Sequence, residues 1–245
     1  MKKITVFLCD DHTIFREGLR LLLSTAEDME VIGEAQNGQR GVREVIRLQP
    51  DVVVMDIAMP LLNGLEASRQ ITRQIPAAKV VILSSYSDEH YVQHAVAAGA
   101  SGYVMKQTTS DDVLLAIREV SKGNAYFSPA IAMILLRQWR TRDAGSNTTL
   151  APALTTRETE VLQLIAEGYC NKQIADMLLV TMKSVDYHRQ TLMRKLDIRG
   201  IASLTRYAVG SGIVKSKRYA QLDGRALWPN SGTNNQHQRT QENRA

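Results

Sequence analysis

Short apolar runs alternate with helical patterns over the first 125 residues of the chain. The runs are rich in β-branched residues, which predicts five strands, at Ile4–Cys9, Val31–Ala35, Val52–Met55, Val80–Leu83 and Gly102–Val104. Between them, apolar residues at helical spacing predict helices near residues 13–25, 39–48, 65–74, 89–98 and 111–122. Strands that alternate with helices imply a parallel sheet covered on both faces. We therefore predict an α/β doubly wound five-stranded parallel sheet of order 2-1-3-4-5.

The pattern changes after residue 125. Ser128–Arg140 predicts one further helix, and a polar, small-residue stretch typical of a linker follows it. From Leu154 to about Lys215 the apolar spacing is purely helical, which predicts a small all-α domain of four helices. The predicted domain boundaries are residues 1–125, a linker with a helix at 126–153, the helical domain at 154–216, and a disordered tail at 217–245 that contains Trp228.

Net charge separates these parts. Residues 1–150 hold 16 Lys and Arg against 17 Asp and Glu, whereas residues 151–245 hold 14 against 8. The excess positive charge lies in the helical domain and the tail, which hints at a nucleic-acid face. No apolar run approaches the roughly 20 residues of a membrane span. The N-terminal run Ile4–Cys9 is too short for a signal peptide, so we expect no membrane contact. The two cysteines, Cys9 and Cys170, show no disulfide or metal spacing, which favours a reducing cytoplasm.

Polar side chains stand at four predicted strand ends. Asp10 and Asp11 follow the first strand and Asp56 the third, Ser84 follows the fourth, and Lys106 the fifth. The carboxyl ends of parallel strands converge on one crevice, where three carboxylates repel one another unless a cation such as Mg²⁺ holds them. Asp56 is then a candidate nucleophile that forms an acyl phosphate, with the metal and Lys106 neutralising its oxygens. The competing interpretations are helix caps for Asp10 and Asp11 and a solvated lysine.

The strand-end motifs "LCDDH", "VVVMDIAMPLLNG", "VILSS" and "GASGYVMK" resemble those of bacterial response-regulator receiver domains, over residues 3–125. The resemblance implies that Asp56 is the phosphoacceptor and that Asp10, Asp11, Asp56 and the Ala58 carbonyl bind Mg²⁺. It also implies that Ser84, Tyr103 and Lys106 form the phosphoryl switch.

In the helical domain, Thr155 and Glu158 form the signature of a capping box. The predicted third helix, about Ser184–Leu196, has an apolar face made by Val185, His188, Leu192 and Leu196. Lys183, Tyr187, Gln190 and Arg194 stand on its opposite face. Such a helix can lie in a DNA major groove, although an ordinary amphipathic surface helix has the same pattern.

This domain resembles the LuxR/NarL-type four-helix DNA-binding domain in "LTTRETEVLQLIAEG", "NKQIA" and "SVDYHRQTLMRKL". The resemblance implies base-edge positions at Asp186, Tyr187 and Gln190, whereas Lys172, Arg189 and Lys195 could reach phosphates. Asp186 departs from the family, because an acid near phosphates lowers affinity unless it accepts from a cytosine amine. The last helix usually makes the dimer contact, and the candidates are Tyr207, Val209 and Ile213.

These observations predict a phosphorylation-dependent transcription regulator of the NarL/FixJ response-regulator family, and not an enzyme. Its expected partners are a sensor histidine kinase, double-stranded DNA and a second copy of the chain. One alternative is a dehalogenase-type phosphatase that uses an aspartyl phosphate, but that family places its two acids two residues apart at the first strand. The other is a binding protein that keeps the pocket without being phosphorylated.

Overall fold

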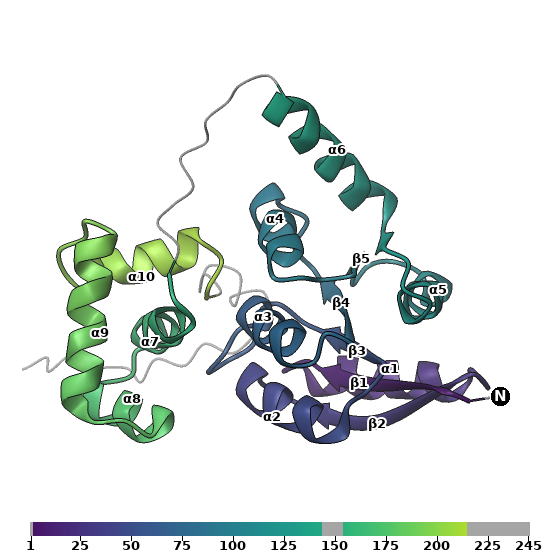
Figure 1. Cartoon of the computed structure of the whole chain (residues 1–245), viewed down its shortest axis with the longest axis horizontal. Coiled ribbons are helices and arrows are strands. Elements are labelled where there is room, and N and C mark those ends of the chain that lie inside the picture. The colour runs from purple at the N-terminus through teal and green to yellow at the C-terminus, as the bar shows by residue number, and fades with distance from the viewer. Residues whose placement is uncertain (1, 144–153, 215–245) are drawn as a thin grey trace, which may run out of the picture. The chain divides into compact units, whose positions relative to one another are not determined.

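The computed structural model describes residues 2–143 and 154–214 (Figure 1). The predictions for residues 144–153, for the tail and for Trp228 concern residues outside these ranges. The α/β part and the helical part are each described by themselves below.

The α/β part is built on a parallel sheet whose strand order is β2-β1-β3-β4-β5-β6. The strands are β1 (Ile4–Cys9), β2 (Met29–Ala35), β3 (Val52–Met55), β4 (Lys79–Ser84), β5 (Gly102–Met105) and β6 (Tyr126–Phe127). All four residues of β3 are buried. Val52 and Val54 pack into one core, and Val53 and Met55 pack into the other. A central strand covered on both faces accounts for the unbroken apolar run in the sequence.

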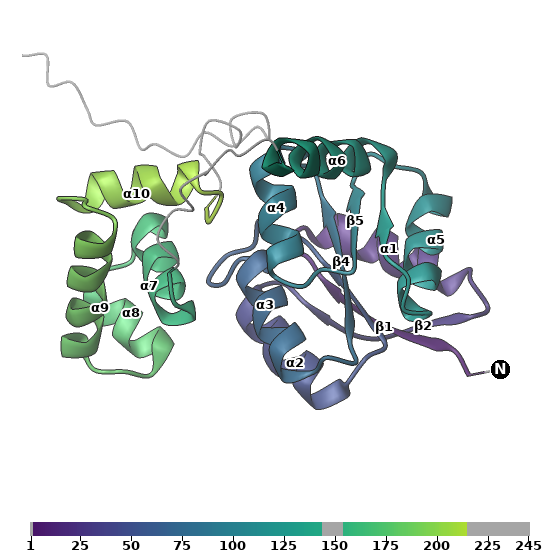
Figure 2. The same cartoon turned by 45° about the horizontal axis from the view of Figure 1, so that its top comes forward.

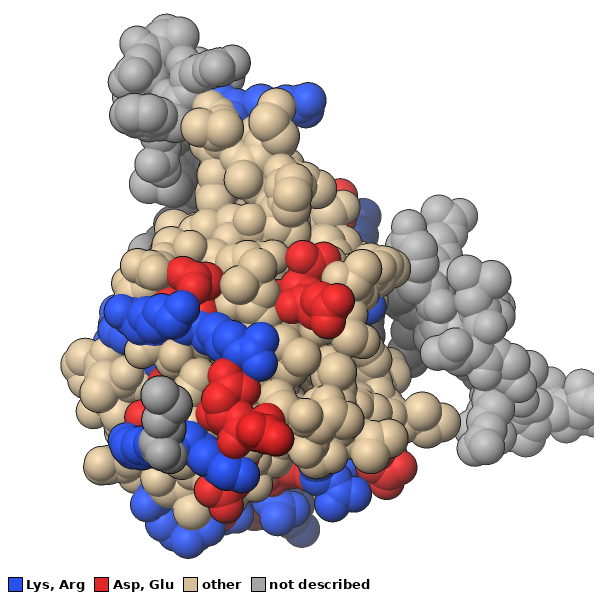
Figure 3. All heavy atoms as spheres, turned by 90° about the vertical axis from the view of Figure 1, so that its right-hand side faces the viewer, with Lys and Arg blue, Asp and Glu red and all other residues tan. Residues whose placement is uncertain are grey.

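Five helices cover the two faces of this sheet (Figure 2). They are α1 (Thr13–Ser24), α2 (Gly38–Leu48), α3 (Gly64–Gln74), α4 (Glu89–Ala97) and α5 (Ser110–Ser121). Buried residues of α1 and α5 share one core, whereas those of α2, α3 and α4 share the other. The predicted alternation of strands and helices is thus confirmed. On the side of the molecule drawn in Figure 3, side chains of both charges are interspersed, as the near-zero net charge of residues 1–150 leads one to expect.

The predicted number of five strands is wrong by one. β6 pairs with β5, through Gly102 opposite Tyr126 and Tyr103 opposite Phe127. A strand of two residues shows no period, so its place in the sheet depends on pairing with a neighbour rather than on local pattern. The following helix, α6 (Pro129–Asp143), places Ile131 in the core between the sheet and α4, where it has no exposed surface. Part of the segment predicted to be a linker is therefore packed against the sheet domain.

The helical part consists of α7 (Thr156–Glu167), α8 (Asn171–Leu178), α9 (Met182–Lys195) and α10 (Ile201–Gly210). The predicted capping box is present, because the Thr155 side chain accepts from the Glu158 backbone N–H and the Glu158 carboxylate accepts from the Thr155 backbone N–H. One apolar core joins the four helices, and its fully buried members include Leu162, Ile174, Val185, Leu192 and Leu204. Among the described residues, none of the helices combines the length and the apolar character needed to cross a membrane.

Candidate functional site

Strand pairing brings the acidic side chains to one edge of the sheet. β1 and β3 are neighbours, and the backbone N–H of Asp56, the first residue after β3, donates over 2.8 Å to the carbonyl of Cys9, the last residue of β1. Asp56 therefore follows β3 directly alongside Asp10, which follows β1. Their side chains are nearly buried, with 4% of each exposed, whereas Asp11 is 27% exposed. Burying carboxylates together is unfavourable unless cations compensate them.

Lys106 supplies one such cation. Its backbone N–H donates to the Ser84 carbonyl over 2.9 Å, which continues the pairing of β4 with β5 and aims the side chain at the acids. Lys106 Nζ lies 2.6 Å from Asp10 Oδ2 and 3.2 Å from Asp56 Oδ1. The same ammonium lies 4.5 Å from the centre of the Phe15 ring, a cation–π distance. Three carboxylates and one ammonium leave a formal surplus of two negative charges.

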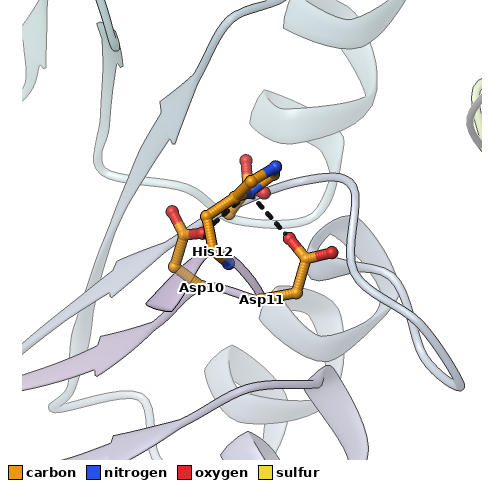
Figure 4. A group of neighbouring side chains, drawn as sticks. Asp10, Asp11 and His12 are labelled. Carbon is orange, nitrogen blue, oxygen red and sulfur yellow. Dashed lines mark hydrogen bonds and ion pairs between the residues drawn. The ribbon is translucent and has the colours of Figure 1, made fainter. Parts of the chain in front are cut away.

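The donor set suits a divalent cation. One donor atom each from Asp10, Asp11, His12 and Asp56 can be chosen so that all four lie within 4.8 Å of one another. Carboxylate oxygens are the ligands that Mg²⁺ prefers, and the surplus charge matches a doubly charged ion. Figure 4 shows His12 between the carboxylates of Asp10 and Asp11. The sequence reasoning missed His12, although its place directly after the two aspartates was visible.

The predicted switch residues lie next to these acids along the sheet. Ser84 ends β4 and has no exposed surface, and its Oγ accepts from the Tyr86 backbone N–H over 3.1 Å. Tyr103 on β5 is also fully buried, and its hydroxyl donates to the Tyr86 carbonyl over 2.6 Å. Burial raises the pKa of Tyr103 well above its ordinary value, so this hydroxyl remains a donor. Ser84 and Tyr103 are therefore linked through the backbone of Tyr86.

The loop after Asp56 is closed by its own backbone. The Gly64 N–H donates to the Ile57 carbonyl over 2.7 Å, and the Asn63 side chain caps α3 by accepting from the Glu66 N–H over 3.0 Å. Ala58 lies inside this loop, two residues after Asp56. The role of its carbonyl stays a prediction.

α9 has the two faces that the sequence predicts. Val185 and Leu192 are buried in the domain core, while Leu196 and His188 are partly exposed. The opposite face is open to solvent, with Tyr187 63% exposed. Its exposed polar members are Lys183, Asp186, Gln190 and Arg194, and Lys172 on α8 is exposed as well. Arg189 is partly exposed.

Two of the predicted DNA-contact residues have partners inside the domain. Lys195 Nζ lies 2.7 Å from Glu158 Oε2, the same carboxylate oxygen that accepts from the Thr155 N–H at the start of α7. Asp186 Oδ1 accepts from the side-chain amide of Asn171 at the start of α8. No local sequence pattern indicates either pairing, because both join residues of different helices.

Comparison with known proteins divides the chain in the same way. Residues 6–118 match the family described as "Response regulator receiver domain", and residues 152–208 match "Bacterial regulatory proteins, luxR family". The transcriptional regulatory protein LiaR of Bacillus subtilis is 39% identical over 205 residues, which cover 84% of this chain and 96% of LiaR. The chain is a response regulator with a LuxR-type DNA-binding domain.

The chain is also similar to other response regulators. The oxygen regulatory protein NreC of Staphylococcus carnosus is 36% identical over 208 residues, which cover 83% of this chain and 96% of that protein. The crystal structure of a LuxR-family two-component response regulator from Aurantimonas sp. SI85-9A1 is 32% identical, covers 57% of this chain and 99% of that one, and gives a TM-score of 0.54. The family consists of transcription regulators rather than enzymes, and this response regulator belongs with them.

Proposed function

We propose that this response regulator is phosphorylated on Asp56. The observation that carries the proposal is the placing of Asp56: a nearly buried carboxylate beside Asp10, with the Lys106 ammonium 3.2 Å away. An Asp56 oxygen attacks the phosphorus of a phosphodonor, and the phosphorus–donor bond breaks as the acyl phosphate forms. We propose that the donor is a phosphohistidine on a sensor histidine kinase.

The cation that we propose for the site is Mg²⁺. Carboxylate oxygens of Asp10, Asp11 and Asp56 and the Ala58 carbonyl would hold it. When bound, Mg²⁺ supplies charge neutralisation for the oxygens of the transferring phosphoryl group. Lys106 then exchanges part of its pairing with Asp56 for pairing with the new phosphate, which carries roughly −1.5 to −2 charges at pH 7.

The switch that we propose runs from Ser84 to Tyr103. The Ser84 hydroxyl turns to donate to the phosphate, which releases the Tyr86 N–H that it accepts from in this structure. Tyr103 is tied to the carbonyl of the same residue, so a change at Ser84 reaches the Tyr103 hydroxyl through one peptide segment. The phosphate shifts the equilibrium between the inactive and active conformations of the receiver domain only by interacting more favourably with one of them.

We propose that α9 enters the major groove of double-stranded DNA. Its exposed face offers Asp186, Tyr187 and Gln190 to base edges. Phosphates would be bound by Lys172, Lys183, Arg189 and Arg194, with Lys195 a weaker candidate because Glu158 holds its ammonium. Two copies of the chain would bind paired half-sites. We propose that the protein works in the cytoplasm.

The test is covalent labelling. The full chain is incubated with acetyl phosphate and Mg²⁺, and the bound phosphoryl group is measured by intact mass and located by peptide mapping. We expect one phosphoryl group on the wild type and none on Asp56→Ala. Asp111→Ala, an exposed acid at the start of α5, is the matched control and should be labelled like the wild type.

Equal labelling of Asp56→Ala and wild type would overturn the assignment. An unlabelled wild type would favour a protein that works without phosphorylation. Continuous release of phosphate from simple phosphate esters would favour the phosphatase alternative.

A further inference from the structure

His12 is the one nitrogen ligand in the group of donors at the acidic site. Its side chain projects over the two aspartates that precede it, and the ring lies between their carboxylates (Figure 4). The His12 backbone N–H donates to Asp10 Oδ1 over 2.8 Å, which fixes the start of the turn that carries the ring. Half of the His12 side chain, 51%, is exposed, so the ring reaches the acids from the solvent side.

The distances around His12 Nδ1 are those of hydrogen bonds, and they also match the spacing of ligands that share one ion. Nδ1 lies 3.0 Å from Asp11 Oδ1 and 3.2 Å from Asp10 Oδ1. Two ligands at right angles, each about 2.1 Å from an ion, are about 3.0 Å apart. The imidazole nitrogen and the two carboxylate oxygens therefore span one side of a coordination shell without any large movement. In the structure, Nδ1 donates to these oxygens, since carboxylate oxygens only accept, and a metal ion bound at this point would take the place of that proton.

The chemistry of the donor atom determines which metal ions it binds more tightly. Mg²⁺ prefers oxygen ligands and keeps several waters, whereas imidazole suits later transition metals, whose affinity rises from Mn²⁺ through Co²⁺ to Ni²⁺. An imidazole binds through the ring nitrogen that carries no proton, so Nδ1 would be the ligand and Nε2 would keep the proton. Nε2 can then point to solvent, which agrees with the half-exposed ring.

We propose that His12 is a ligand of the divalent cation at the acidic site and that its nitrogen favours Mn²⁺, Co²⁺ and Ni²⁺ over Mg²⁺. This inference rests on the cation site proposed above, to which it adds one residue and a metal preference. The oxygen donors are sufficient for Mg²⁺, so phosphorylation of Asp56 with Mg²⁺ does not require His12.

The experiment uses Mn²⁺ and Co²⁺ with the full chain. A pair of histidines on α4, His90 and His94, has ring centroids 4.0 Å apart and could bind transition metals itself. All measurements are therefore made in a His90→Gln/His94→Gln background, with and without His12→Gln. Pulsed electron paramagnetic resonance of bound Mn²⁺ should show coupling to an imidazole nitrogen, and that coupling should disappear in His12→Gln.

The affinities give a second readout. In His12→Gln, the Kd for Co²⁺ should rise about tenfold or more while the Kd for Mg²⁺ changes by less than about threefold. His12→Asn serves as the second variant, and His188→Gln in the DNA-binding domain is the control that should change neither value. Circular dichroism verifies that each variant is folded.

The outcomes separate this inference from the proposed function. Mn²⁺ that binds without nitrogen coupling, or coupling that persists in His12→Gln, would overturn the role of His12 and leave the cation site in place. A chain that binds neither Mn²⁺ nor Mg²⁺ would overturn both the cation site and the role of His12.

Discussion

A methyl group on Gly64 would lie 1.8 Å from the backbone oxygen of Asp56. α3 thus begins in direct contact with the peptide that carries the proposed phosphoacceptor. The constraint is one of space, because a backbone atom cannot turn aside as the end of a flexible side chain can.

Replacing Gly64 by Ala should therefore lower the stability of the receiver domain by about 1–3 kcal/mol and reduce labelling of Asp56 by acetyl phosphate. Urea denaturation measures the first effect and intact mass the second. Gly18→Ala is the matched control, since nothing lies within 4 Å of a Cβ at this position of α1. That change should leave labelling intact and be neutral or slightly stabilising, because alanine favours helices. Equal effects of the two substitutions would contradict the steric argument.

Lys106→Met should destabilise the receiver domain by about 3 kcal/mol, because it leaves the nearly buried Asp10 and Asp56 without their cation. Mg²⁺ should restore part of this loss, so the rise in Tm on adding Mg²⁺ should be larger in the variant than in the wild type. Lys122→Met removes a lysine from an exposed pair with Glu119 and should change stability by no more than about 0.5 kcal/mol. A Mg²⁺ effect of the same size in wild type and Lys106→Met would argue against charge compensation by Lys106.

Glu158 should make the stability of the DNA-binding domain depend on pH. Burial alone would raise its pKa, but the hydrogen bonds from Lys195 and Thr155 outweigh burial and lower the pKa below its ordinary value. The carboxylate therefore stabilises the folded state above its unfolded pKa of about 4.3, and this contribution is lost as the pH falls through the lower folded pKa.

The measurement compares wild type with Glu158→Gln by thermal denaturation between pH 7 and pH 3. The wild type should be more stable by about 1 kcal/mol at pH 7, and the difference should fade in acid. Lys195→Met and the double variant Glu158→Gln/Lys195→Met complete a double-mutant cycle, which measures how much of the stability difference comes from the ion pair. A difference that does not change with pH would mean that the ionised carboxylate is not the stabilising form.

Two substitutions should affect DNA binding in different ways. Gln190→Ala removes a side chain from the exposed face of α9 and should change the preferred sequence, at a cost of about 1–3 kcal/mol for the best site. Lys172→Ala should weaken binding to all duplexes alike. It should also make the slope of log binding constant against log salt concentration shallower by about one. Gel shifts over a range of salt concentrations measure both effects. Lys122→Ala, the same charge change in the receiver domain, is the control, and a Gln190→Ala variant with unchanged sequence preference would show that the recognition face is wrongly assigned.

The sequence by itself determined the sheet domain and the place of its acidic site. Period and length distinguish the buried strand β3 from the helices around it, and the ends of parallel strands share one edge. Asp10, Asp56, Ser84 and Lys106 could thus be grouped before any distance was known. Their grouping depends on the strands being parallel, which the alternation of strands with helices along the chain indicates.

Only the tertiary structure decided which side chains meet. β6 is too short to leave a pattern and exists because β5 offers an unpaired edge. Lys195 has the character of a phosphate contact in the sequence, yet its ammonium lies against Glu158 of another helix. His12 is an unremarked residue in the sequence, and the structure places its ring on the two carboxylates. The direction of a long or aromatic side chain depends on neighbours that are distant in the sequence, whereas the period of a strand or helix depends on residues that are adjacent.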